Sequence, residues 1–264
     1  ADIMKIALFR IHQDLLAQDL RSRVLLQIHD ELVVEIAAGG WDTVERIVRD
    51  RMGGAAELSV PLDVQVGRVL DALRPAGLHE KTIVVFASDH GLAIGSHGLF
   101  GKQNLYDHSM HAPLIFAGPG VPKGKRADAL CYLLDIFPTL GDVAGVVPPE
   151  GSEGKSLAPV LRGSATKARD SLFTAYVKVD RDVREDRWKL LDYPRINKSQ
   201  LFALEKDPGQ TKDLASDPAH EAELKRLTSM LESAQREYGD ALPLRSDKPD
   251  PLEFDFTKVK AGKK

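Results

Sequence analysis

The stretch KTIVVFASDHG, residues 81–91, decides the fold of the larger part of this chain. Its continuous apolar run, Ile83–Ala87, is typical of a strand that is buried on both faces of a mainly parallel sheet. Three polar residues, Ser88, Asp89 and His90, follow at the point where this strand ends. Active sites of open α/β sheets lie at the carboxyl ends of strands, so this position favours a functional site.

The residues before this strand fit two periodicities. The first half of PLDVQVGRVLDALRPAG, residues 61–77, alternates apolar and polar side chains as a strand does. Four apolar residues have instead the i, i+3, i+4, i+7 spacing of a helix face, namely Val66, Val69, Leu70 and Leu73. We expect the helix to prevail from about Asp63, because its apolar face can pack on the strand at 82–87 and this burial outweighs weak local propensities.

The elements expected downstream continue an α/β pattern and then change to antiparallel strands. The string APLIFAGPG, residues 112–120, predicts a strand and a turn, and LLDIFPTLGDVAGV predicts a short helix that closes at Gly145. After Gly163, the runs LFTAYVKV, RWKLLDY and QLFAL predict a small antiparallel sheet. A helix of about 20 residues should follow the Asp-Pro pair at 217–218.

Composition limits the classes of partner. The 264 residues are 43% hydrophobic and 28% charged, which is ordinary for a globular protein. A net charge of −3 offers no basic field, so nucleic acid or an acidic membrane would have to be recognised locally. No apolar run approaches the roughly 18 residues of a membrane span, and no signal peptide is visible, so the chain as it stands is expected to be cytoplasmic.

Eight strings between residues 66 and 240 occur in an order that resembles the sulfatases of the alkaline-phosphatase-like superfamily. They are VGRVLDAL, TIVVFASDHG, GLFGK, PLIFAGPG, DIFPTLGDVAG, GKSLAPVLRG, DRWKLL and QLFALEKDPGQTKDL. The resemblance implies an α/β fold with part of the sulfatase sheet and a small C-terminal antiparallel subdomain. It also implies that the substrate class is a sulfate ester.

The same resemblance implies roles for three residues. Asp89 and His90 would bind a calcium ion, and Lys102 in GLFGK would bind the sulfate group. Calcium takes oxygen ligands, so Asp89 is chemically the firmer assignment and a histidine nitrogen the softer one. Lys102 offers a point charge to an anionic ester oxygen. The alternative is a capped strand end beside a solvated lysine.

The nucleophile that the family uses has no counterpart here. Sulfatases convert the cysteine of a Cys-x-Pro-x-Arg motif into formylglycine, whereas the only cysteine, Cys131, begins the string CYLLD. Its apolar surroundings favour an inert buried thiol, and a single cysteine excludes an intrachain disulfide and a multi-cysteine zinc site. We therefore expect calcium and sulfate half-sites but no turnover from this chain alone.

Three histidines follow the expected site and raise the alternative of a second metal. They are His97, His108 and His111. Packing or hydrogen bonding is the favoured interpretation for them. His111 also stands where the sulfatase family commonly has an arginine, which puts a substrate or sheet-edge contact there in doubt.

The first 66 residues have a different character. Residues 2–17 and 42–52 have helical patterns, and two apolar runs, Val24–Ile28 and Leu32–Ile36, flank the tripeptide His29-Asp30-Glu31. This arrangement predicts a helix–hairpin–helix segment with an acidic hairpin tip. For an isolated hairpin, a solvated turn is the ordinary interpretation.

The string LLQIHDELVVEI, residues 25–36, resembles the end of the palm of family A DNA polymerases. That resemblance implies that Asp30 binds catalytic Mg²⁺ and that Glu31 is an auxiliary acid. It also implies that His29 and Gln27 contact the primer terminus. Nucleotidyl transfer needs two metal ions, and one carboxylate cannot hold both. Nucleic acid is therefore a partner only in this alternative interpretation.

Together these observations predict a chimera with four segments. We expect a polymerase palm fragment at 1–66, a sulfatase core fragment at 67–163, a sulfatase C-terminal subdomain at 164–245 and a loosely attached tail at 246–264. Three hypotheses stay open: a sulfatase portion that does not turn over, a polymerase remnant that binds Mg²⁺ and primer–template, and a fusion without selected function.

Overall fold

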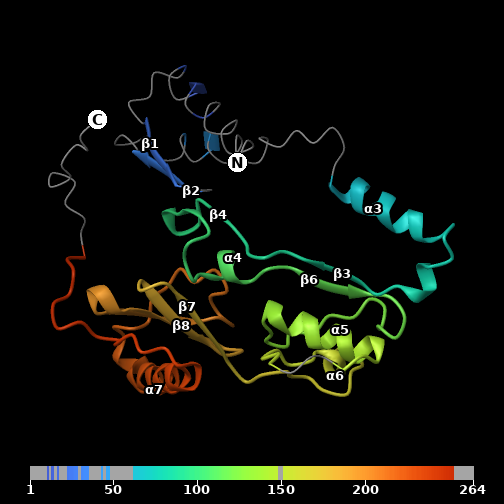
Figure 1. Ribbon diagram of the computed structural model, residues 1–264. Helices are drawn as coiled ribbons and strands as arrows, with labels where there is room; N and C mark the ends of the chain where they lie inside the picture. The colour runs from blue at the N-terminus through green and yellow to red at the C-terminus, as the bar shows by residue number, and fades with distance from the viewer. Residues whose placement is uncertain are drawn as a thin grey trace. The chain divides into compact units, whose positions relative to one another are not determined.

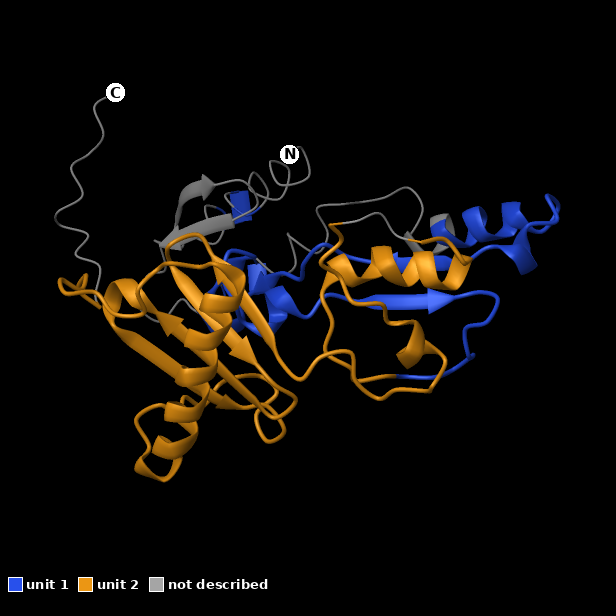
Figure 2. Ribbon diagram, turned by 60° about the horizontal axis from the view of Figure 1, so that its bottom comes forward, with its two compact units in different colours: residues 1–126 blue, residues 127–264 orange. Residues whose placement is uncertain are grey.

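A computed structural model describes most of the chain after the first 61 residues. Residues 62–147 and 151–252 are described, as are the strands at 23–28 and 31–35 and the single residues 11, 13, 14, 17, 43, 46 and 47. The chain divides into two compact units, residues 1–126 and residues 127–264, which Figure 2 colours separately. Each unit is described by itself below.

The first unit contains short strands in three two-stranded sheets (Figure 1). Its strands are β1 (Arg23–Ile28), β2 (Glu31–Glu35), β3 (Val84–Ala87), β4 (Ala93–Ile94), β5 (Phe100–Gly101) and β6 (Leu114–Ala117). The helices that are described in full in this unit are α3 (Leu62–Leu73), η1 (His79–Lys81), η2 (Ser96–Gly98) and α4 (Asp107–Met110). The pairs β1–β2, β3–β6 and β4–β5 are all antiparallel.

The expected N-terminal hairpin is present as β1 and β2. Ile28 pairs with Glu31, so Glu31 begins the second strand rather than lying in the turn where the sequence pattern put it. His29 and Asp30 lie outside the described residues, as does the side chain of Glu31.

The ambiguous stretch is helical at residues 62–73, as expected. Helix α3 spans Leu62–Leu73, so the 3.6-residue period prevails over the alternating one. Its apolar face is not fully buried, however, because Val69 is 67% exposed. The expectation that the whole stripe packs on the following strand is thus wrong at Val69.

The strand that decides the fold is less buried than its sequence predicts. β3 pairs antiparallel with β6, and Phe86 lies opposite Ile115. Ile115 is 57% exposed and Phe86 is 40% exposed. The expectation of a strand buried on both faces of a parallel sheet is wrong for β3 in the described part of the chain, where its one paired neighbour is antiparallel. A continuous apolar run shows that both faces of a strand could be buried, but it does not show that other elements cover them.

The second unit begins with helices that are locked by a buried ion pair. Its first elements are η3 (Leu133–Asp135), α5 (Ile136–Ala144) and α6 (Ala158–Leu161). Asp135 pairs with Arg169 and also accepts the backbone N–H groups of Tyr132 at 2.8 Å and Lys155 at 2.7 Å. As the sequence predicts, α5 ends at Gly145, which takes the left-handed conformation of a helix C-cap (φ 71°).

The rest of the second unit is an antiparallel sheet with a long helix, as expected, although the strand at 180–184 was not predicted. The sheet has the order β10-β9-β8-β7. The elements are β7 (Leu172–Tyr176), β8 (Asp180–Arg184), β9 (Trp188–Tyr193), η4 (Pro194–Ile196), β10 (Lys198–Ala203), η5 (Pro218–His220) and α7 (Glu221–Tyr238).

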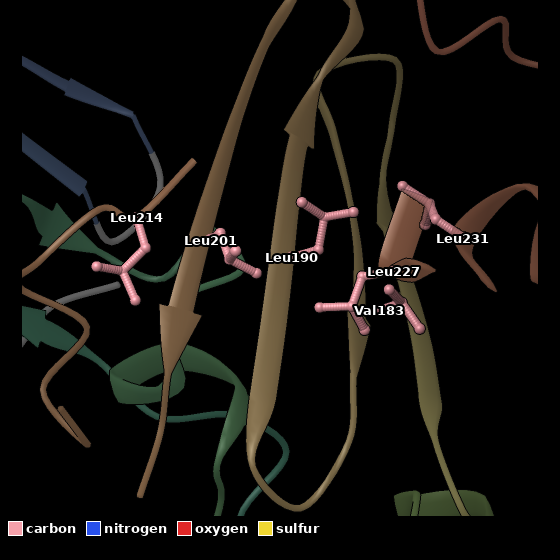
Figure 3. Close-up of a cluster of buried hydrophobic side chains, with 6 residues drawn as sticks. All are labelled: Val183, Leu190, Leu201, Leu214, Leu227 and Leu231. Atoms are coloured by element: carbon pink, nitrogen blue, oxygen red, sulfur yellow. The ribbon is translucent and has the colours of Figure 1, made fainter. Parts of the chain in front are cut away.

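This sheet and α7 enclose the main apolar cluster of the second unit. Figure 3 shows its six buried side chains, which come from the strands, from α7 and from the loop after β10. They are Val183, Leu190, Leu201, Leu214, Leu227 and Leu231. Val183 lies opposite Leu190, and Leu190 lies opposite Leu201, so cross-strand pairing brings these three side chains together on one face of the sheet.

Candidate functional site

The expected site residues gather at the end of β3. The strand stops at Ala87, and the backbone N–H of Ser88 donates to the carbonyl of Pro113 before β6. The Ser88 hydroxyl donates to the carbonyl oxygen of His90 at 2.8 Å. A serine hydroxyl that bonds the backbone two residues on stabilises a turn. This turn sets the positions of the two side chains that follow.

Gly91 holds this turn close to α4. Its N–H donates to the carbonyl of Ser109 at 2.7 Å, and a Cβ atom at this position would lie 2.0 Å from the carbonyl oxygen of His108. Any larger residue would push the two backbones apart. The sequence analysis missed this role, although a glycine directly after a polar cluster is the signal for such a close approach.

Lys102 reaches the same turn from the β4–β5 hairpin. It directly follows Gly101, the last residue of β5, and Ala93 in β4 is fully buried, which anchors the hairpin. The Lys102 Nζ atom lies 2.6 Å from Nε2 of His90. The structure thus brings Asp89, His90 and Lys102 together, although twelve residues separate the histidine from the lysine.

The hydrogen-bond partners of His90 fix its tautomer. Nδ1 lies 2.6 Å from the carbonyl oxygen of Gly91, which can only accept, so Nδ1 carries the proton. In the neutral ring Nε2 then has only a lone pair, and it accepts from the Lys102 ammonium. An imidazolium would instead place two cations at hydrogen-bond distance. The Asp89 carboxylate, with Oδ2 3.2 Å from Nε2, adds a negative charge at the same point.

The three side chains differ in exposure. Asp89 is 79% exposed, whereas His90 and Lys102 are half-buried. A carboxylate that solvent reaches can bind a cation without a large desolvation cost. The Asp89 carboxylate is therefore open to solvent, whereas the Lys102 ammonium is partly shielded from it.

The cluster fits part of a divalent-cation site. Asp89 Oδ2 and His90 Nε2 are adjacent donors, and the Nδ1–H of a metal-bound histidine ordinarily donates to a carbonyl, as it does here. The Lys102 ammonium lies next to His90 Nε2, where a metal ion bound by this nitrogen would lie. Calcium needs six to eight ligands, and the described residues contain no group of three or more His, Cys, Asp or Glu side chains that could hold a metal. These residues can supply part of a coordination shell.

The neighbouring histidines are packing residues, as expected for two of them. The ring of His97 stacks on Tyr106 with centroids 4.0 Å apart, and the ring of His108 lies 5.7 Å from Tyr106. His111 is exposed beside α4. The contribution of Tyr106 was not predicted, because an aromatic stack between loops leaves no periodic signal in the sequence.

Cys131 lies in the second unit and is half-buried. Burial raises the pKa of its thiol, and the nearby carboxylate of Asp135 raises it further. A raised pKa lowers the thiolate fraction, which agrees with the prediction of an inert thiol.

Within the described part of the chain, no helix combines the length and the apolarity that a bilayer crossing requires.

Three family models match the chain. Residues 95–237, more than half of the chain, match "N-sulphoglucosamine sulphohydrolase, C-terminal", and residues 43–146 match "Sulfatase". Residues 1–69 match "DNA polymerase family A", so this match overlaps the sulfatase match at 43–69.

Individual relatives agree with the sulfatase matches. The delta 4,5-hexuronate-2-O-sulfatase of Bacteroides thetaiotaomicron is 37% identical over 64% of this chain and 37% of its own length. A solved 2-O GAG sulfatase is 32% identical, with a TM-score of 0.67 over 79% of this chain and 47% of its own. The phosphonate monoester hydrolase of Agrobacterium radiobacter is 28% identical, with a TM-score of 0.64 over 77% of this chain and 44% of its own.

The chain spans about a third of the length of the curated relatives it matches. The solved relatives support an alkaline-phosphatase-like sulfatase fold for the matched part. On the family match that covers more than half of its residues, the chain belongs to the sulfatase family.

Proposed function

We propose that this chain is the C-terminal region of a sulfuric ester hydrolase and that it supplies part of a sulfate-ester site. The observation that carries the proposal is the cluster of Asp89, His90 and Lys102 at the end of β3. In this assignment Lys102 binds the sulfate group, and Asp89 and His90 contribute to a calcium site.

The charges of the cluster support a divalent cation at Asp89 in this proposal. A sulfate ester is an anion, and the Lys102 ammonium attracts it while the exposed Asp89 carboxylate repels it. A divalent cation at Asp89 would reverse that repulsion and would polarise an ester oxygen. In this proposal Lys102 binds and orients the anion, and Asp89 holds the cation that offsets the repulsion between the carboxylate and the anion.

The chain alone is proposed to bind the ester without cleaving it. Nucleophilic attack on sulfur requires an activated group, and Cys131 does not lie in a Cys-x-Pro-x-Arg motif. Its half-buried thiol with a raised pKa is a poor nucleophile in its own right.

The relatives narrow the class of ester. The names of three of them describe enzymes of sulfated sugars: a delta 4,5-hexuronate-2-O-sulfatase, a 2-O GAG sulfatase and an N-acetylglucosamine-6-O-sulfatase. We therefore propose a sulfated saccharide as the ligand of Lys102. The likeness to a phosphonate monoester hydrolase makes a phosphonate monoester the appropriate competitor.

The proposal is tested by NMR titration of the labelled chain with glucosamine 6-sulfate and, separately, with the phosphonate monoester phenyl methylphosphonate. We expect saturable shifts around Lys102 with the sulfate ester, which Lys102→Ala abolishes. Lys123→Ala, which removes an exposed lysine of a loop in the same unit, is the matched control and should leave the shifts intact. Equal shifts in the wild type and Lys102→Ala would contradict the assignment, and tighter binding of the phosphonate would reassign the ester class.

A second candidate function is supported by the polymerase match of residues 1–69 and by the antiparallel β1–β2 hairpin. In this chimera reading, Asp30, with Glu31 beside it, binds Mg²⁺, and His29 and Gln27 contact a primer–template. Salt-sensitive binding of a primer–template that is lost in Asp30→Ala supports it. Failure of both this test and the sulfate-ester titration favours a fusion without selected function.

A further inference from the structure

The lone pair of His90 Nε2 has two competing uses. It accepts a hydrogen bond from Lys102 at 2.6 Å, and it lies 3.2 Å from the Asp89 carboxylate. A metal ion would be bound by the same lone pair and the same carboxylate, because Nδ1 is already committed as a donor to Gly91. An ammonium group and a divalent cation cannot share this position.

We propose that Lys102 occupies the cation position of the Asp89–His90 pair, so that a divalent cation must displace its ammonium to bind. The displaced ammonium then turns toward the anionic ester. The inference rests on the proposed function, since it uses the same lysine for the sulfate group. It adds an order of binding, with the cation first and the ester second.

The two ligands should therefore strengthen each other. A cation that displaces Lys102 makes the lysine available to the ester, and an ester that holds Lys102 removes the competitor of the cation. Coupling of binding free energies is reciprocal, so both ligands must show the same factor. The hydrogen bond to His90 opposes the cation in the absence of ester, and a hydrogen bond that involves a charged group corresponds to about tenfold in affinity.

The test is calcium titration by calorimetry in a double-mutant cycle. The variants are Lys102→Met, His90→Ala and the double variant, with Lys123→Met as the matched lysine control and circular dichroism as the check on folding. We expect Lys102→Met to bind calcium about tenfold more tightly than the wild type. In the His90→Ala background the same lysine change should matter by about twofold, because the competition for Nε2 is gone.

A general charge effect gives a different result. If Lys102 acts only by its positive charge, Lys102→Met tightens calcium binding by the same factor with and without His90. That outcome overturns the proposal, as does the absence of calcium binding by every variant up to about 10 mM, above the weakest ordinary protein calcium sites. An unchanged affinity in Lys102→Met overturns it too.

Failure here is distinguishable from failure of the proposed function. The NMR titration with glucosamine 6-sulfate reads Lys102 directly and can be run with a chelator present. Ester binding that depends on Lys102 but is uncoupled from calcium would refute the displacement alone. Ester binding that is independent of Lys102 would refute the proposed function.

Discussion

The four-stranded sheet of the second unit and the β3–β6 pair of the first unit are both antiparallel, yet they are buried to different degrees. In the second unit, Leu190 on a central strand and Leu227 on α7 are fully buried within one apolar cluster (Figure 3). In the first unit, Phe86 and Ile115 face each other across two strands and remain substantially exposed. The candidate site follows the less buried of the two.

The difference in burial indicates that the second unit is the more stable part, whereas the candidate site lies in the less stable part. Each buried Å² of apolar surface stabilises by about 25 cal/mol, so the second unit has the larger share of the hydrophobic stabilisation among the described residues. A two-stranded sheet is marginal in water without further packing. We therefore expect the second unit to unfold at a higher denaturant concentration than the segment that positions Asp89 and Lys102.

The largest expected effect comes from breaking the buried ion pair of the second unit. Asp135→Ala leaves the Arg169 guanidinium buried without its carboxylate and removes the acceptor of two backbone N–H groups. We expect a loss of about 3–5 kcal/mol in the free energy of unfolding, measured by urea titration. Glu205→Ala, which breaks an exposed pair with Arg187, is the control and should cost at most about 1 kcal/mol. If Asp135→Ala and Glu205→Ala lost the same free energy of unfolding, the buried ion pair would contribute no more to stability than the exposed one, which would contradict the prediction.

The next effect compares the two apolar surfaces directly. Leu227→Ala opens a cavity in the buried cluster and should cost about 3 kcal/mol. Val69→Ala removes an apolar side chain that is mostly exposed and should change stability by about 0.5 kcal/mol or less. Urea midpoints of the two variants provide the measurement. A cost at Val69 that matches the cost at Leu227 would show that α3 is packed.

A smaller effect depends on pH and on Asp180 in β8. Burial raises the pKa of this carboxyl to about 7 from its ordinary 3.8, and the charge of Asp182 adds to the shift. The folded state thus binds this proton more tightly than the unfolded state does. The contribution to stability is complete below about pH 4 and is lost as the pH rises through about 7.

The measurement for Asp180 is urea unfolding at pH 5 and pH 8. Asp180→Asn should reduce the loss of stability across this interval by about 1–3 kcal/mol. Asp170→Asn, at an exposed position, should leave the loss unchanged. Asp240 does not confound the comparison, because its hydrogen bond from Arg181 lowers its pKa to about 2 and its contribution disappears only in more acidic solution. If Asp180→Asn lost as much stability between pH 5 and pH 8 as the wild type does, the prediction would be contradicted.

The sequence predicted the second unit better than the first, for a physical reason. The apolar runs of β7, β9 and β10 and the leucine spacing of α7 are local patterns, and these elements belong to one unit. Strand β8, with the sequence DRDVR, has no such pattern and was not predicted. The apolar run of β3 carries no information about which strands cover it, so its antiparallel pairing and exposure were not foreseen. At 61–77 the helical period was the correct choice, but the exposure of Val69 could not be read from that period.

The structure brings Asp89, His90 and Lys102 together, but their contacts were not predicted from the sequence. Asp89 and His90 follow a strand, and Lys102 was placed with them through family resemblance alone. The hydrogen bond from Lys102 to His90 Nε2 depends on the β4–β5 hairpin and on the close approach of Gly91 to His108. The second of these contacts joins two different loops, so no local pattern predicts it. Residues His29 and Asp30 lie outside the described residues, so the polymerase hypothesis stays a prediction.

The central claim is that this chain binds a sulfate ester but lacks the group that attacks it. Release of 4-nitrophenol from 4-nitrophenyl sulfate by the purified chain, with and without calcium, tests this claim most directly. The account predicts no release above that of buffer, because Cys131 is not a formylglycine precursor and no other nucleophile has been assigned. Release that Asp89→Ala or Lys102→Ala abolishes, in protein free of other sulfatases, would contradict it.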